Sequence, residues 1–246
     1  GFDISGIVGS TVDHGGYGFL MNTYDAAWPL IPMVRYDQSY ATAIGKWMLN
    51  AANAARFFYP QYIPAAHQSI PQLSEVTKGV IGYEGLIKNP SHKINENLQG
   101  PVAQGDGPLW VPGKNPLVSQ FSVYGSGHVG IFGSIIRPTN VKGILQLNLL
   151  ATDFFHDKAY PTFLYYNPYS EKKTITIKIN DEGKTDLYNT VTGSFVVRNV
   201  SSSTEINLSA KSAAVIICVP SNGKITYQGK KMLVNKVVVD FMVQKK

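Results

Sequence analysis

The sequence contains little of several residue types and patterns that usually reveal a protein's class. It has one cysteine, Cys218, in 246 residues, so an internal disulfide cannot form. Charged residues make up 15% of the chain, against about 25% in an average soluble domain, while hydrophobic residues make up 44%. No apolar run approaches the roughly 18 residues that a membrane-spanning helix needs. The composition therefore excludes intrinsic disorder and a disulfide framework, and it predicts no transmembrane segment.

The sequence also lacks the spacing patterns of several common sites. The five histidines are scattered without paired metal-ligand spacing, which argues against a structural zinc site. The segment Gly125–Gly130 has a glycine, not a serine, at the centre of its glycine cluster, so it is not a nucleophile elbow, and no βαβ unit surrounds it for dinucleotide binding. We therefore expect no cofactor. This argument does not extend to a calcium ion, because the oxygen ligands of calcium leave no such spacing signature.

The net charge of +6 is unevenly placed. The surplus of basic residues lies entirely beyond residue 160 and consists mostly of scattered lysines. Scattered lysines are typical of solvated faces and of protected sheet edges, whereas nucleic-acid binding favours clustered arginines. We expect no nucleic-acid partner.

One long amphipathic helix is predicted over residues 40–58. Apolar residues recur there at steps of three and four, which places them on one helical face. Asp37 or Ser39 is suited to cap its start, and Pro60 ends it.

Three further segments are predicted to be helical. Residues 80–88 form a short helix in this prediction, and Val129 to Ile136 has helical spacing. Residues 141–149 also have helical spacing, with Thr139 or Asn140 as the cap. Their β-branched residues, however, keep a strand as the alternative.

Beyond residue 160 the hydrophobic period becomes two. Short alternating segments follow at intervals of about ten residues, separated by Gly, Pro, Asn and Ser. This is typical of an antiparallel β-sandwich. The predicted strands are residues 163–166, 174–179, 186–188, 194–197, 205–208 and 213–219, with further strands near 224–227 and 234–243.

This order of parts resembles a known architecture. Together with the segments Gly15–Gly18, Met21–Asp25, Asn50–Arg56 and Phe163–Pro168, it resembles the C-terminal part of carbohydrate-active α/α-toroid proteins of the six-hairpin type, which end in a β-sandwich. The resemblance implies an α+β chain with a partial helical toroid over residues 1–157 and a sandwich over 158–246. A complete toroid needs about a dozen helices of ~10–14 residues, so we expect this chain to be a piece of a longer protein with an upstream domain.

Two carboxylates flanking a glycosidic bond, roughly 5 to 10 Å apart, are what glycoside hydrolysis requires. Asp25 and Asp37 are the first candidates, because they are twelve residues apart and the prolines between them permit a turn that brings both to one rim. For Asp37, however, helix capping is the favoured interpretation. Glu84, between a tyrosine and a glycine, is a third candidate.

A polysaccharide lyase would instead need a His or Tyr base beside a neutralising arginine. His14, Tyr17, Tyr24 and Arg35 could supply that set, and His14 is the histidine that we would test first because two glycines follow it.

Two tryptophans, Trp28 and Trp110, lie in predicted loops, where an exposed indole often serves as a sugar platform. We therefore expect an extracytoplasmic protein that processes oligo- or polysaccharides, its signal peptide not within this chain. Hydrolysis by paired carboxylates is the first hypothesis. A lyase, and a carbohydrate-binding or structural fragment without catalysis, are the alternatives.

Overall fold

The structure is a computed structural model, and it describes residues 17–19, 30–55, 81–86, 102–106, 128–179 and 183–243. The chain divides into two compact units. The first consists of Gly1–Ala27 and Asn50–Phe132, and the second of Trp28–Leu49 and Gly133–Lys246. Residue 157, where the sequence analysis places its boundary, lies inside the second unit.

The first unit contains a small antiparallel sheet. Its strands are β1 (Tyr17–Phe19), β2 (Ile81–Leu86) and β3 (Val102–Asp106), in the order β1-β2-β3. The prediction of a helix over residues 80–88 is wrong, because β2 pairs on both sides, with β1 and with β3. Backbone hydrogen bonds to two neighbouring strands override the helical spacing of its few apolar residues.

Among the residues that the structure describes, the helical elements are few. Residues 30–36 are helical, a 3₁₀ turn, η1, spans Gln38–Tyr40, and α3 spans Ala41–Ala55. The latter confirms the predicted long helix, with Ile44 and Met48 among its buried residues. The predicted helix at 129–136 is confirmed as α4 (His128–Ile135).

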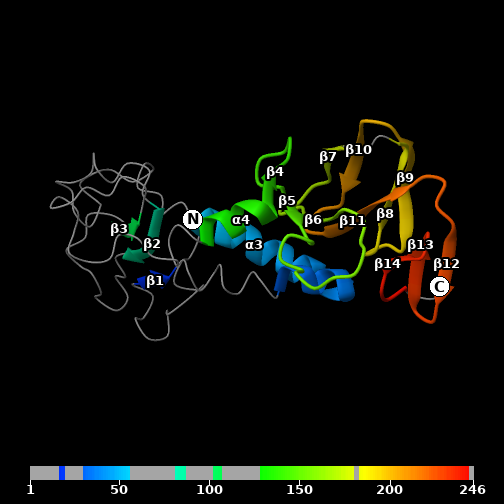
Figure 1. The fold of residues 1–246 in the computed structure, drawn as a ribbon. Coiled ribbons are helices and arrows are strands. Elements are labelled where there is room, and N and C mark those ends of the chain that lie inside the picture. Colours follow the sequence, from blue (N-terminus) through cyan, green and yellow to red (C-terminus); the bar gives the residue numbers. More distant parts are fainter. Residues whose placement is uncertain are drawn as a thin grey trace. The chain divides into compact units, whose positions relative to one another are not determined.

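Antiparallel sheet dominates the second unit (Figure 1). Six strands form one sheet in the order β4-β5-β6-β11-β8-β9. These are β4 (Ile136–Pro138), β5 (Leu145–Asn148), β6 (Thr162–Tyr166), β8 (Thr185–Asn189), β9 (Ser194–Val200) and β11 (Ala213–Pro220). Two strands, β7 (Lys173–Lys178) and β10 (Ser203–Leu208), form a second sheet, and β12 (Ile225–Gln228), β13 (Lys231–Val234) and β14 (Val237–Asp240) form a third.

The predicted C-terminal antiparallel strands are thus confirmed. The one predicted over 234–243 is divided, because Asn235 and Lys236 both adopt positive φ in the two-residue turn between β13 and β14. The partial toroid over residues 1–157 is not confirmed, because the described part of that region contains the strands β1 to β5 as well as its helices.

The predicted helix over residues 141–149 is also wrong. Residues 145–148 form β5, which pairs with β4 on one side and β6 on the other. Thr139 does not cap a helix, because its hydroxyl donates to the carbonyl of Ile144 at 2.7 Å and accepts from the amide of Val141 at 3.1 Å, closing the loop. The strand alternative prevails because neighbouring strands satisfy its backbone groups and its β-branched neighbours favour strands.

Two cores lie on opposite faces of the six-stranded sheet. Ala214, Ile216 and Cys218 of β11 belong to the cluster that β7 and β10 cover, while Ile217 and Val219 belong to the cluster that β13 and β14 cover. Alternate residues of a strand point to opposite faces, so β11 is buried on both. This explains its continuous apolar sequence, and it confirms Cys218 as a small buried hydrophobic residue.

Candidate functional site

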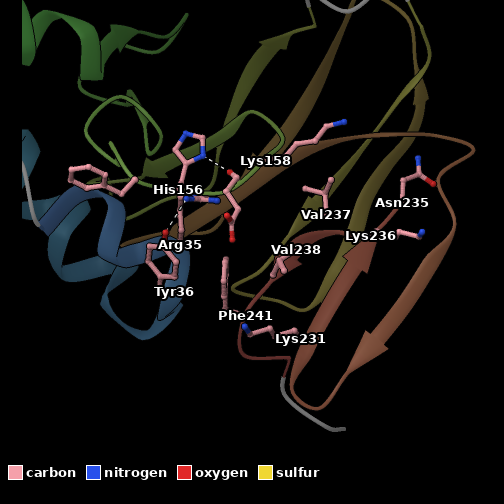
Figure 2. A pocket seen from close by; sticks show the side chains of 12 residues that line it. Arg35, Tyr36, His156, Lys158, Lys231, Asn235, Lys236, Val237, Val238 and Phe241 are labelled. Carbon is pink, nitrogen blue, oxygen red and sulfur yellow. Dashed lines mark hydrogen bonds between the residues drawn. The ribbon is translucent and has the colours of Figure 1, made fainter.

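A pocket of about 460 Å³ in the second unit is the candidate site (Figure 2). We call it the Phe241 pocket; its lining consists of residues 35–36, 155–158, 231, 235–238 and Phe241. Three segments distant in sequence form it: the helical residues 30–36, the loop after β5, and the strands β13 and β14 with the residue after them. Its volume is within the range of about 300–1,000 Å³ that is usual for small-molecule sites.

A buried ion pair holds one side of the pocket. Arg35 pairs with the carboxylate of Asp153, and both side chains are largely buried. The hydroxyl of Tyr36 donates to the same carboxylate oxygen at 2.9 Å. Burial, and then the hydrogen bond to Asp153, raise the pKa of Tyr36 above its usual value. A phenol whose proton is held by a carboxylate is a poor general base.

Aromatic rings form the apolar part of the pocket. The rings of Tyr36 and Phe241 lie 4.7 Å apart between centroids, tilted by 55°. Phe155 is 100% exposed on the loop after β5. A fully exposed phenylalanine at the edge of a pocket offers an apolar face that folding leaves uncovered.

The position of Phe241 is determined by its neighbours in the chain. Gln38 donates its side-chain amide to the carbonyl of Met242 at 3.0 Å, which ties η1 to the segment after β14. The amide of Met242 donates to Asp240 at 2.9 Å. These two bonds hold the segment on both sides of Met242, so the Phe241 ring stays beside Tyr36.

His156 is held in the loop by a hydrogen bond to the neighbouring backbone. Its Nδ1 lies 2.5 Å from the carbonyl oxygen of Asp157. A carbonyl can only accept, so Nδ1 carries the proton and Nε2 is the acceptor when the ring is neutral.

The sequence-predicted site residues are distributed as follows. Arg35 lines the Phe241 pocket, but Asp153 already matches its charge. Asp37 has the capping role that the sequence analysis favoured: its carboxylate accepts from the amide of Ser39 at 2.9 Å, and this bond lowers the pKa of Asp37.

Two others lie in the first unit's sheet, where Glu84 pairs with Phe19, and Tyr17 is two residues along the same strand as Phe19. The register therefore brings Tyr17 and Glu84 to neighbouring strands. The remaining candidates lie outside the described residues: His14, Tyr24, Asp25, Trp28 and Trp110.

Sequence reasoning did not identify Tyr36, Phe155, His156 or Phe241 as site residues. The run Phe154-Phe155-His156 carried no distinctive signal, because adjacent aromatic residues are also usual in buried segments. Phe241 carried none either, since in the sequence it belongs to the last predicted strand.

The fold and the pocket together define a mainly antiparallel β protein with a cavity of ligand size. No protein-family model and no curated protein matches the chain. A solved structure, that of an Anoxybacillus α-amylase described as providing insights into a new glycosyl hydrolase subclass, is similar over 33% of this chain and 16% of its own, with 17% identity and a TM-score of 0.25. The similarity thus spans about a sixth of that enzyme.

Within the part of the chain that the structure describes, no group of three or more His, Cys, Asp or Glu side chains is placed to hold a metal ion. None of the helices described has the length and apolar character needed to cross a membrane.

Proposed function

We propose that this is a carbohydrate-active protein whose Phe241 pocket binds a glycan. The observation that carries the proposal is the combination of a fully exposed ring, Phe155, with the paired rings of Tyr36 and Phe241 in one pocket. A sugar ring has an apolar face of C–H groups and a rim of hydroxyls. Aromatic faces bury the first, and polar side chains such as Asn235 can hydrogen-bond the second.

Binding is favoured over lyase chemistry at this pocket. A lyase arginine must neutralise the substrate carboxylate, but Arg35 is paired with Asp153. The phenol of Tyr36 is bonded to the same carboxylate and its pKa is raised, so it does not supply the base near neutral pH.

Hydrolysis is a second candidate function, and it belongs to the first unit. Glu84 lies on β2 beside the strand that carries Tyr17. The backbone register, which brings the segments of Glu84 and Tyr17 onto adjacent strands, supports the proposal that Glu84 and Asp25 are the paired carboxylates. An extracytoplasmic location, where polysaccharide substrates are met, belongs to the same proposal.

Affinity electrophoresis tests binding. The whole chain is run in native gels that contain polygalacturonate, xylan or soluble starch. At least one polysaccharide should retard it, and Phe155→Ala should weaken that retardation about fivefold, which is about 1 kcal/mol. A sugar covers only one face of a ring whose complete burial is worth about 1.5–3 kcal/mol.

Phe154→Ala is the matched control, because Phe154 is 67% exposed and does not line the pocket. Equal effects of the two variants, or retardation by none of the gels, would contradict the proposed site. Released reducing ends in the same mixtures would support hydrolysis; Asp25→Asn and Glu84→Gln should then abolish release, whereas Asp37→Asn should leave it unchanged.

A further inference from the structure

Positive charge gathers at the Phe241 pocket. Lys158, Lys231 and Lys236 line it, against one acidic side chain, Asp157. The charge of Arg35 is matched by Asp153. Among the residues that the structure describes, none of the three lysines forms an ion pair. With His156 neutral, the lining therefore carries a net charge of two positive units that folding does not neutralise.

The three lysines lie at two positions relative to the aromatic rings, one beside them and two farther out. The Nζ of Lys231 lies 5.5 Å from the centroid of the Phe241 ring, so its ammonium group lies beside the aromatic part of the pocket. Lys158 and Lys236 extend outward from the rim (Figure 2). A sugar unit bound against the rings would thus lie close to the ammonium group of Lys231. The neighbouring sugar units of the same glycan would lie near Lys158 and Lys236.

We infer that the glycan bound at the Phe241 pocket is acidic, with carboxylate or sulfate groups on its sugar units. This inference rests on the proposed function, which supplies the sugar. The aromatic rings would pack against the apolar face of a pyranose, and the lysines, which form no ion pair, would attract a negative substituent on it. A small inorganic anion would leave the rings without a role, and a neutral glycan would leave the lysines without one.

Isothermal titration calorimetry on the whole chain tests this inference. The probes are trigalacturonate, its full methyl ester, which has the same rings without the charge, a chondroitin sulfate tetrasaccharide and a short oligothymidylate. We expect trigalacturonate or the sulfated tetrasaccharide to bind more tightly than the methyl ester. We expect this preference to shrink as salt is raised, because salt screens exposed charges.

Variants that remove either a positive or a negative charge from the pocket sharpen the test. Each of Lys158→Gln, Lys231→Gln and Lys236→Gln should weaken binding of the acidic probe by about 1.5- to 5-fold, since an exposed ion pair is worth little more. Asp157→Asn should strengthen it by a similar factor and leave the ester unaffected. Lys172→Gln, Lys178→Gln and Lys184→Gln are matched controls, since these lysines do not line the pocket.

The outcomes separate the two proposals. If the ester binds as tightly as the acid, and Phe155→Ala weakens both, the glycan site stands and its acidic preference is wrong. If no oligosaccharide binds, both fall. Tighter binding of oligothymidylate than of every sugar, or equal losses in the control lysine variants, would also overturn the inference.

Discussion

Asn167 shows how one buried polar side chain can organise a loop. It is fully buried directly after β6, and its side-chain amide faces three backbone carbonyls, those of Glu171, Leu208 and Ser209, at 2.9–3.1 Å. Its side-chain oxygen accepts from the amide of Tyr169 at 3.0 Å. The residue thus joins the loop before β7 to the end of β10, in a place that water does not reach.

Asn167→Asp should be strongly destabilising. The substitution replaces the donating amide with a carboxylate that faces three carbonyl oxygens. Because carbonyls only accept, the buried carboxylate has no hydrogen-bond donor there, and its charge has no counter-ion. We expect a loss of about 3–5 kcal/mol in the free energy of unfolding, measured by urea denaturation. Asn167→Ala, which leaves carbonyls unsatisfied without adding a charge, should cost less, about 1–3 kcal/mol. A larger loss for alanine than for aspartate would contradict this role.

At the scale of elements, α3 approaches the six-stranded sheet at a glycine. A Cβ at Gly45 would lie 2.6 Å from the Cβ of Tyr166 and 3.8 Å from Cδ2 of Leu164. Both of these side chains are on β6, and both are buried. The absence of a side chain at this one helical position lets the helix backbone lie against the strand.

Gly45→Ala should therefore destabilise the second unit, although alanine is the better helix former. Relief of the clash requires the helix or Tyr166 to shift, and we expect a cost of about 1–3 kcal/mol in thermal or urea unfolding. Gly133→Ala in α4 is the matched control. A Cβ there meets nothing within 4 Å, so its effect should be neutral or stabilising by up to about 1 kcal/mol. Equal effects of the two substitutions would contradict the close approach.

At the scale of the molecule, one buried hydrogen bond joins two sheets of the second unit. The Tyr188 hydroxyl on β8 donates to the Asp240 carboxylate at the end of β14 at 3.0 Å, and both residues are buried. Burial raises the pKa of Asp240, and the bonds from Met242 and Tyr188 only partly oppose it. Burial, and then the Asp240 charge, raise the pKa of Tyr188 as well. Asp240 is thus ionised at a cost, in the segment that positions Phe241.

This pair makes stability depend on pH. Because the pKa of Asp240 is higher folded than unfolded, the folded state binds its proton more tightly. The stability that this tighter proton binding adds to the folded state is fully present below the pKa of the unfolded state, about 3.8. It is lost as pH rises through the raised pKa of Asp240 in the folded state. Asp240→Asn keeps a neutral group able to bond Tyr188. Relative to the natural chain, we expect this variant to gain stability as pH rises across that window.

Urea denaturation of both proteins between about pH 3 and pH 7 measures that difference. Tyr188→Phe is the complementary variant, since it removes a donor to the buried carboxylate and should cost about 1–3 kcal/mol at neutral pH. A difference between Asp240→Asn and the natural chain that stays constant with pH would refute the linkage.

Much of the second unit was predictable from local patterns. Period-two alternation between turn residues located the strands, and the continuous apolar run of β11 predicted a buried strand and a buried Cys218. The Asp37 cap was equally local, because the carboxylate and the amide that it accepts from are two residues apart. Such features depend on neighbours in the chain, so the sequence by itself determined them.

Tertiary structure decided the rest. Residues 81–86 and 145–148 are strands because partners distant in sequence satisfy their backbone groups, which no local period reveals. The pocket joins Tyr36, Phe155 and Phe241, three aromatic residues separated by more than eighty positions at each step. Side chains so far apart along the chain come together only when the sheets pack, so the sequence supplied the rings, whereas the packing decided that they share a site.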